Sequence, residues 1–304
     1  MKTKIAIIGA GRIAYSLTSA LLKEGYIVDT IISRKINSAK ALAGKFGVKK
    51  YFDDKNLISK SVNVFFITVP DSEIKKTAVQ LSKLKFSTAF FIHFSGAEDI
   101  SVLNPLKVKG GKTGSLHLMQ TFPSKKIVNI KNVNSAIETN DDSMYKFLLQ
   151  LCSDLQLIPF RIDSKDKTYY HLAGVFASNF LAGNLLNAQK LLSLNNIDEQ
   201  KYFKILSSTI QSTLQNIKTV GPAKALSGPV ERGDIKTIQK HIYSLKRKSK
   251  KSNSSYFSML LNNYIVQSLN LINLVEEKHG ELNQSHQDIK KLLVRELSKI
   301  GNSI

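Results

Sequence analysis

Histidines at the ends of predicted elements are the residues of this chain best suited to acid–base chemistry. Six histidines are present, and histidine is the side chain whose ordinary pKa lies closest to neutral pH. His117 follows a predicted strand, and His171 stands at the start of a long predicted helix. Each could donate a proton beside a reacting carbon, or pack as a hydrogen-bonded core group. The residues alone leave this choice open for both.

Two further polar residues are candidates for holding a substrate. In a regular helix, at about 100° per residue, Asn179 lies at the edge of the face that carries His171 and Ser178. Arg232 lies in the motif SGPVERGD, which predicts a rigid break between helices. There its guanidinium could hold a carboxylate through two parallel hydrogen bonds. The competing interpretation is that Arg232 and Asp234 lock this loop to its neighbours.

A glycine-rich turn near the N-terminus predicts a dinucleotide site. The run GAGRIA begins at Gly9 and stands between a predicted buried strand and a predicted helix, the context that the G-x-G-x-x-A pattern requires. Gly9 permits the tight turn, Gly11 lets the backbone approach a pyrophosphate, and the small Ala14 allows close packing of helix on strand. Arg12 and Ile13 open the helix, whose N-terminal N–H groups attract phosphate.

The end of the second predicted strand indicates which dinucleotide binds. NAD sites place an acidic residue there, about 20 residues beyond the glycines, to bond the ribose 2′-hydroxyl. This chain has Ser33, Arg34 and Lys35 instead, and Asp29 lies earlier in the strand. A hydroxyl, a guanidinium and an ammonium suit a 2′-phosphate. We therefore expect NADP as the cofactor.

Two later strand ends are expected near the nicotinamide. Val69 and Pro70 end one predicted strand, and the run HFSG, which contains Ser95 and Gly96, ends the next. Open α/β sheets bind their ligands outside the carboxyl ends of the strands. Pro70 and Gly96 are therefore expected to shape the backbone around the ring.

The order of elements predicts an α/β fold followed by helices. Predicted strands lie at residues 4–8, 27–32, 63–69, 88–94, 114–118, 133–138 and 158–162, with helical patterns between most of them. This alternation predicts a Rossmann-type, mostly parallel sheet covered on both faces. Beyond Asp163 only helical patterns occur, at about 167–194, 199–219, 234–245, 255–278 and 286–299. We predict an NADP-binding domain over residues 1–163 and an all-helical substrate and dimerisation domain over residues 164–304.

Charge and composition limit the remaining functions. Lys and Arg total 44 against 23 Asp and Glu, a net charge of +21, which raises the question of nucleic acid or acidic membranes. The densest run, Lys246–Lys251, contains no aromatic residue, and Ser252, Asn253, Ser254 and Ser255 follow it. A solvated loop is favoured over a polyanion site, which stays as a third hypothesis.

Membrane spans, disulfides and metal sites are not expected. No run approaches the roughly 18 apolar residues of a membrane span. The single cysteine, Cys152, excludes an internal disulfide and gives no cysteine-based metal site. We therefore expect a cytoplasmic protein without a bound metal.

Six motifs together carry a family resemblance. In order along the chain they are GAGRIA, VPD, HFSG, SLHLMQTF, YYHLAGVFASNF and ALSGPVERGD. They resemble the NADP-dependent oxidoreductases that join a Rossmann-like domain to a DUF2520-type domain, relatives of pyrroline-carboxylate reductase and the 3-hydroxyacid dehydrogenases. The resemblance extends over nearly the whole chain. It implies a helical dimerisation domain and a cofactor cleft between the domains, against the helix that bears His171 and Asn179.

Two departures from these relatives limit what the resemblance implies. Leu118 stands where the family has proline after the histidine, and the lysine of the 3-hydroxyacid dehydrogenases is not matched on the long helix, where this chain offers His171. The mechanism of the dehydrogenases is therefore not carried over.

Two functions of different classes fit these observations. The first is an NADP-dependent reductase or dehydrogenase that acts on a small, anionic carbonyl, imine, hydroxy or amino substrate. His171 or His117 would donate the proton, and Asn179 or Arg232 would position the substrate. The alternative is a non-catalytic NADP-binding module that senses redox state or regulates a partner. A homodimer is expected in either case, and the identity of the substrate stays open.

Overall fold

The computed structural model describes residues 3–86, 88–195, 197–252 and 255–301. It has two compact units, Met1–Ala182 and Gly183–Ile304, and each is described by itself. The last strand ends at Arg161, close to the proposed domain boundary at residue 163. The helix that carries His171 follows that strand and still belongs to the first unit.

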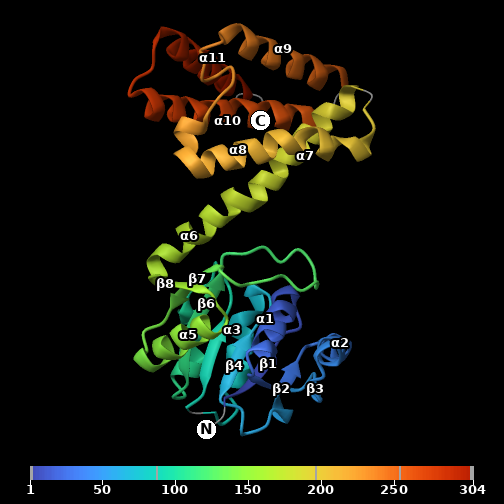
Figure 1. Ribbon diagram of the computed structural model, residues 1–304, viewed down its shortest axis with the longest axis vertical. Helices are drawn as coiled ribbons and strands as arrows, with labels where there is room; N and C mark the ends of the chain where they lie inside the picture. The colour runs from blue at the N-terminus through green and yellow to red at the C-terminus, as the bar shows by residue number, and fades with distance from the viewer. Residues whose placement is uncertain (1–2, 87, 196, 253–254, 302–304) are drawn as a thin grey trace. The chain divides into compact units, whose positions relative to one another are not determined.

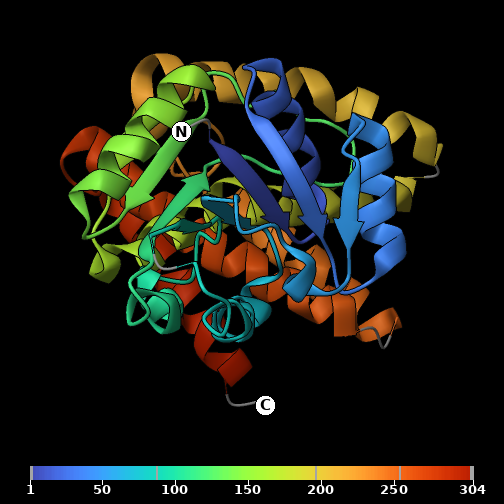
Figure 2. The ribbon, with the colours of Figure 1, turned by 90° about the horizontal axis from the view of Figure 1, so that it is seen from below.

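The first unit is built on an eight-stranded sheet in the order β3-β2-β1-β4-β5-β6-β7-β8. The strands are β1 (Lys4–Ile8), β2 (Ile27–Ile32), β3 (Lys50–Phe52), β4 (Val64–Ile67), β5 (Phe90–His93), β6 (Lys112–Leu118), β7 (Asn134–Glu138) and β8 (Ile158–Arg161). The pairs from β3 to β6 are parallel, β7 is antiparallel to β6, and β8 is parallel to β7. In Figure 2 the blue strands β1, β2 and β3 lie side by side and point the same way. The predicted mostly parallel sheet is confirmed.

Helices cover both faces of this sheet (Figure 1). One core contains side chains of α1 (Arg12–Lys23), α2 (Ile36–Phe46) and α5 (Asp142–Asp154). The opposite core contains side chains of α3 (Asp71–Leu81) and α4 (Asn104–Lys107). Successive residues of β1 alternate between the two cores, since neighbouring side chains of a strand point to opposite faces. A sheet buried on both faces explains why its strands are continuous apolar runs.

The long helix predicted from residue 167 is interrupted by a different helical geometry. It comprises α6 (Lys167–Gly174), a π-helical turn at Val175–Phe180, and α7 (Leu181–Leu192). A π turn bonds residue i to i+5 rather than i+4, so the spacing of about 100° per residue does not hold beyond Val175. The expected placement of Asn179 relative to His171 assumed that spacing, so it stays a prediction. The Asn179 side chain is exposed.

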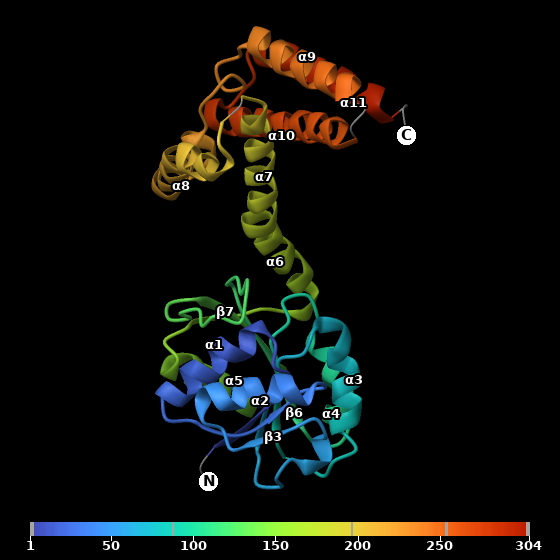
Figure 3. The ribbon, with the colours of Figure 1, turned by 90° about the vertical axis from the view of Figure 1, so that its right-hand side faces the viewer.

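The second unit is helical, as predicted. It contains α8 (Tyr202–Ala225), α9 (Ile235–Ser252), α10 (Ser255–His279) and α11 (Gln284–Gly301). Helices α9, α10 and α11 lie side by side around an apolar core (Figure 3). In contrast, α7 has no buried side chain among its described residues, and α8 buries only Tyr202 and Ala223. Several large apolar side chains of α7 and α8 are exposed.

The prediction of a loop at Lys246–Lys251 is wrong, because these residues continue α9. Ile238, Ile242 and Leu245 are buried at positions i, i+4 and i+7, so the helical pattern runs up to the basic residues. Lysine and arginine are themselves good helix formers. Lys246 is ion-paired with Glu296. Asn253 and Ser254 lie outside the described residues.

None of the helices in the described part of the chain is long and apolar enough to cross a membrane.

Candidate functional site

The glycine turn between β1 and α1 is closed by a threonine from the neighbouring strand. Gly9 has a φ of +112°, and a Cβ at this position would lie 2.7 Å from the carbonyl carbon of Thr68, so only glycine fits. The Thr68 hydroxyl donates to the carbonyl oxygens of Gly9, at 2.8 Å, and of Ile8. Because β2 and β4 flank β1 on opposite sides, the sheet order reverses at this turn, where open α/β sheets bind their ligands.

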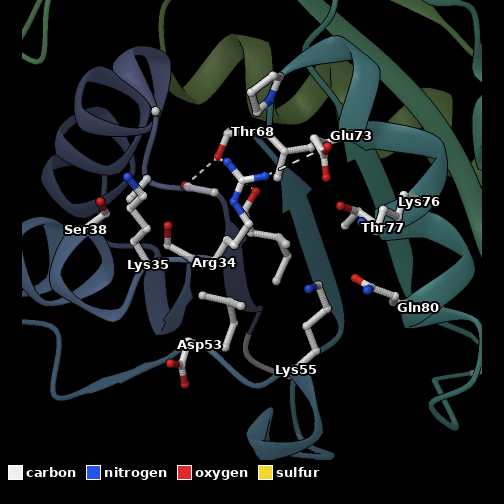
Figure 4. Close-up of a pocket in the computed structure, with 18 residues that line it drawn as sticks. Arg34, Lys35, Ser38, Asp53, Lys55, Thr68, Glu73, Lys76, Thr77 and Gln80 are labelled. Carbon is white, nitrogen blue, oxygen red and sulfur yellow. Dashed lines mark hydrogen bonds and ion pairs between the residues drawn. The ribbon is translucent and has the colours of Figure 1, made fainter.

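A cleft of about 500 Å³ opens at this turn (Figure 4). Seven of the residues that we predict to bind the cofactor line this cleft: Gly9, Gly11, Ser33, Arg34, Lys35, Val69 and Pro70. Four cationic side chains line the cleft, against the two acidic side chains of Asp53 and Glu73. An excess of cations fits a nucleotide that carries an additional phosphate.

Arg34 lies centrally in the cleft. Figure 4 shows it reaching toward Glu73 and Thr68, and its Nη1 lies 4.0 Å from Glu73 Oε1. Its side chain is 82% exposed, so the guanidinium remains accessible to an anion. Asp29 does not line the cleft, since it binds Lys50 at 3.0 Å. The acidic residue of the second strand therefore points to another partner than the cleft.

Lys55 and Lys76 line the same cleft, and the sequence analysis did not identify them. Burial lowers the pKa of Lys55, and the charge of Lys76 lowers it further. The carboxylate of Asp54 acts in the opposite direction and raises it. Lys55 follows β3, a three-residue strand too short to give a pattern. Lys76 could have been found from its position on α3, where it follows Glu73 by one helical turn and so lies on the same helix face.

A second cavity of about 410 Å³ adjoins the first. The two cavities share Gly11, Thr68, Val69 and Pro70. Beyond these, the second cavity is lined by Arg12, Ile13, Phe94, His117, Leu118, Gln120 and Phe122. It therefore leads from the start of α1 to one of the two candidate histidines. Its walls are largely apolar, which is typical of a site for a small organic molecule.

His117 and His171, which are distant in sequence, converge over Gly96. Their ring centroids lie 6.0 Å apart. A Cβ at Gly96 would lie 2.6 Å from His117 Nε2 and 2.6 Å from His171 Nδ1. Gly96 is therefore needed for space between the rings. The neighbouring Ser95 accepts hydrogen bonds from the backbone N–H groups of Ala97 and Glu98, so its hydroxyl shapes this turn.

The environment of His117 favours the neutral imidazole and gives its Nδ1 a hydrogen-bond partner. Burial lowers the pKa of His117 to about 4, and the charges of His171 and Lys167 contribute. Its Nδ1 lies 2.9 Å from the Tyr170 hydroxyl, and burial raises the pKa of Tyr170 to about 12. The phenol therefore keeps its proton. When it donates its hydrogen bond to Nδ1, the proton of the neutral imidazole lies on Nε2, the atom that faces Gly96.

Lys167 stands beside this pair and was missed by the sequence analysis. It is 1% exposed, and its Nζ lies 2.7 Å from both Ser115 Oγ and Glu138 Oε2. The other oxygen of Glu138 accepts hydrogen bonds from Ser164 Oγ, at 2.6 Å, and from Ile100 N, at 3.0 Å. One signal was available: Lys167 precedes His171 by four residues and so shares its helix face.

The other two candidate residues lie in the π turn and in a loop of the second unit. Asn179 lies exposed in the π turn. Arg232 belongs to the second unit, in a loop where Gly228 and Gly233 have positive φ. There Asp234 Oδ1 accepts from Thr237 N at 3.1 Å and caps α9. The predicted break between helices is confirmed, whereas the roles of Asn179 and Arg232 stay predictions.

In the described part of the chain, no group of three or more His, Cys, Asp or Glu side chains is placed to hold a metal ion.

Two families match successive parts of this chain. The family described as NADP oxidoreductase, coenzyme F420-dependent, matches residues 4–92, which contain the glycine turn and the Arg34 cleft. DUF2520, a domain of unknown function, matches residues 133–263. The chain therefore matches an NADP oxidoreductase family over its first part and DUF2520 over its second. The expected cofactor, NADP, is confirmed, and its binding at Ser33–Lys35 stays a prediction.

Solved structures share this two-domain fold. A Bacteroides fragilis protein provisionally described as an NADP oxidoreductase is 25% identical, with a TM-score of 0.75 over 89% of this chain and 98% of that one. An imine reductase from Pseudomonas sp. is 18% identical, with a TM-score of 0.59 over 89% and 96%. A pyrroline-5-carboxylate reductase from Coxiella burnetii is 15% identical, with a TM-score of 0.52 over 89% and 99%. The last two show the fold alone. No curated protein sequence matches the chain.

Proposed function

We propose that this protein transfers a hydride between NADP and a small, anionic carbonyl or imine substrate, or the corresponding hydroxy or amino compound. The observation that carries this proposal is the second cavity. It adjoins the NADP cleft at Gly11 and Pro70 and has His117 in its wall. A cavity beside the cleft, with a directed hydrogen-bond donor, is the arrangement that hydride transfer requires.

The residues of the cleft fit NADP. The backbone N–H groups at the start of α1 bind the pyrophosphate, since Gly9 and Gly11 leave no side chain in its way. Ser33, Arg34 and Lys35 bind the 2′-phosphate, and Lys55 and Lys76 add positive charge on the other side of the cleft. The bound cofactor supplies or accepts the hydride.

The two histidines have different roles in this proposal. With a pKa of about 4, His117 is neutral near pH 7, so it donates a hydrogen bond from Nε2 to the substrate oxygen or nitrogen without losing its proton. His171 transfers the proton, since its ring faces the same space above Gly96. Ser95 and Gly96 shape the adjoining backbone, and Asn179 or Arg232 positions the substrate.

The proposed charge of the substrate is supported by the charges of the protein. The exposed Arg12 lines the second cavity, and the net charge of +21 gives a field that attracts anions. A substrate that carries a carboxylate would gain from both effects.

We also propose a cytoplasmic homodimer. Its support is the exposed apolar surface of α7 and α8, which includes Phe203 at 60% and Leu214 at 50% exposure. An uncovered apolar surface of this kind marks an association site. The single cysteine, Cys152, is buried and unpaired, which fits a reducing compartment.

Parallel fluorescence titrations with NADPH and NADH test this function. The wild-type protein should bind NADPH much more tightly than NADH, and Arg34→Asp should lose that preference. Lys40→Asp is the matched control, because Lys40 is an exposed cation of the adjacent α2 and does not line the cleft. Absence of binding to either nucleotide would reject the proposal. Tight NADPH binding without oxidation by carboxylate-bearing carbonyl and imine compounds would favour the non-catalytic NADP-binding module instead.

A further inference from the structure

The ammonium of Lys167 is buried inside the first unit, close to the cofactor cleft but not part of it. It is held between Ser115 of β6 and Glu138 of β7, at 2.7 Å from each. Removing a lysine and a glutamate from water costs several kcal/mol per ion before their attraction is counted. An apolar pair of similar volume would join a helix to a sheet without that cost. The buried ion pair therefore indicates a role beyond packing.

The geometry shows what the pair joins. Ser115 precedes His117 by two residues on β6, so both side chains lie on the same face of the sheet. Lys167 precedes His171 by four residues on α6, so both lie on the same face of the helix. The hydrogen bond from Lys167 to Ser115 therefore links the strand that carries His117 to the helix that carries His171.

The second partner fixes the position of the ammonium. Glu138 lies opposite Ser115 in the register of β6 and β7, and its Oε2 also accepts a hydrogen bond from Ser115 Oγ at 3.2 Å. Its other oxygen is held by Ile100 N and by Ser164 Oγ, just before α6. Every oxygen of this carboxylate is therefore occupied, and Lys167 Nζ has a defined place.

We propose that Lys167 is a positioning residue that fastens the first turn of α6 to β6 and β7 and thereby sets His171 opposite His117 above Gly96. The proposal rests on the proposed function only in so far as the two histidines act on a substrate. Lys167 itself touches neither cofactor nor substrate. Its charge also disfavours protonation of the histidines nearby, because a second positive charge in a buried space is repelled.

Several charged groups act on His117, and the test must separate them. On α6 these groups are Lys167 and His171, and the Tyr170 hydroxyl is hydrogen-bonded to His117. On β5, the charge of His117 lowers the pKa of the buried His93. Glu138 on β7 neutralises Lys167, and Asp71 and Asp99 act on Lys167 from further away. A substitution of Lys167 alone would leave the Glu138 carboxylate buried without its partner.

The experiment therefore compares the wild-type protein with the double variant Lys167→Met/Glu138→Gln. The glutamine keeps an oxygen for Ile100 N and Ser164, and the methionine fills the space of the lysine stem. Both proteins are labelled with 13C in their histidine rings and studied by NMR without nucleotide. The matched control is Lys165→Met, which removes an exposed lysine two residues earlier.

We expect the double variant to lose the nuclear Overhauser contact between the His117 and His171 rings. The pKa of His117 should rise, because the charge of Lys167 lowers it in the wild-type protein, whereas Lys165→Met should change neither. The NADPH dissociation constant should stay within about 2-fold of the wild-type value, since Lys167 does not line the cleft. If the double variant does not fold, Ser115→Ala, which leaves the ion pair intact, should weaken the same contact.

A lower melting temperature with an unchanged histidine contact and an unchanged titration would overturn the proposal and leave Lys167 a structural residue. The NMR measurement needs no nucleotide, so this result stays separate from a failure of the proposed function. That failure would appear as a wild-type protein in which the two histidines are in contact but NADPH does not bind.

Discussion

The Tyr170 hydroxyl can set which nitrogen of His117 carries the proton. Without the phenol, a neutral imidazole would distribute its proton between two nitrogens according to solvent and substrate. When the hydroxyl, 2.9 Å away, donates to Nδ1, Nε2 is the donor before any substrate arrives. The energetic advantage is preorganisation, because a donor that is already aimed needs no rearrangement during the reaction.

The first prediction concerns pH and stability at His117. The folded-state pKa of about 4 lies below the value of about 6.5 expected for an unfolded chain. Between these values the unfolded chain binds more protons than the folded protein, so acidification through this range lowers the free energy of unfolding. The loss attributable to His117 should be on the order of 2 kcal/mol after allowance for its partial exposure.

Urea unfolding at neutral pH and at about pH 4.5 measures this loss. The His117→Gln variant should lose less stability on acidification than the wild-type protein, while His241→Gln, which replaces an exposed histidine of α9, should behave like the wild type. An equal loss in His117→Gln would show that His117 titrates alike in both states.

The second prediction concerns the space between the histidines. A methyl group at Gly96 would lie 2.6 Å from a nitrogen of each ring, so Gly96→Ala should displace at least one ring and cost about 1–3 kcal/mol of stability. Gly183→Ala is the control, because no atom lies within 4 Å of the added methyl group and alanine favours a helix. Chemical denaturation measures both, and a wild-type stability for Gly96→Ala would contradict the described arrangement.

At the scale of the elements, the turn between β1 and α1 depends on a side chain of another strand. Thr68 Oγ1 donates to the carbonyl oxygens of Gly9 and Ile8 and is 5% exposed. Thr68→Val keeps the shape but leaves these carbonyls without that donor, so it should cost about 1–3 kcal/mol. Because we propose that the turn binds the pyrophosphate, NADPH binding should weaken as well.

The chain offers a matched control for this third prediction. Thr18 is fully buried in α1, and its hydroxyl has no hydrogen-bond partner among the residues that the structure describes. Thr18→Val should therefore leave both stability and NADPH affinity close to the wild-type values. Denaturation and fluorescence titration of the two variants give the comparison, and equal effects would mean that the Thr68 hydrogen bonds contribute little.

Elements with a strong local pattern could be predicted from the sequence. The GAGRIA turn combines an apolar strand, two glycines and a helical repeat within a short segment, so its structure and its ligand are both encoded locally. The same holds for Ser33 and Arg34, which follow a buried strand directly and line the cleft as expected. The break at Gly228 and Gly233 was likewise marked by residues that tolerate positive φ.

Elements defined by long-range contacts could not be predicted in this way. A lysine in a polar stretch is typical of an exposed residue, and only the pairing of β6 with β7 brings Glu138 to Lys167. The short strand β3 exists because β2 offers it a partner. The run Lys246–Lys251 was interpreted as a loop from its charge, although its apolar neighbours already continued the helix.

At the scale of the whole molecule, the exposed apolar surface of α7 and α8 leads to the fourth prediction. Light scattering should give twice the monomer mass for the wild-type protein. Phe203→Glu/Leu214→Glu, at residues that are 60% and 50% exposed, should give a monomer, because charges are expensive to bury in an interface. Tyr243→Glu, at an exposed residue of α9, should remain dimeric. A monomeric wild type would reject the dimer.

The π turn at Val175–Phe180 has a consequence for comparing this chain with its relatives. A π-helical turn holds one residue more than the α-helical turn it replaces, and such turns mark single-residue insertions. An alignment against a relative with a uniform α-helix needs a one-residue gap within this segment. Without that gap, the alignment would pair either His171 or the residues beyond Phe180 with the wrong residues of the relative. Equivalent catalytic residues would then look like substitutions.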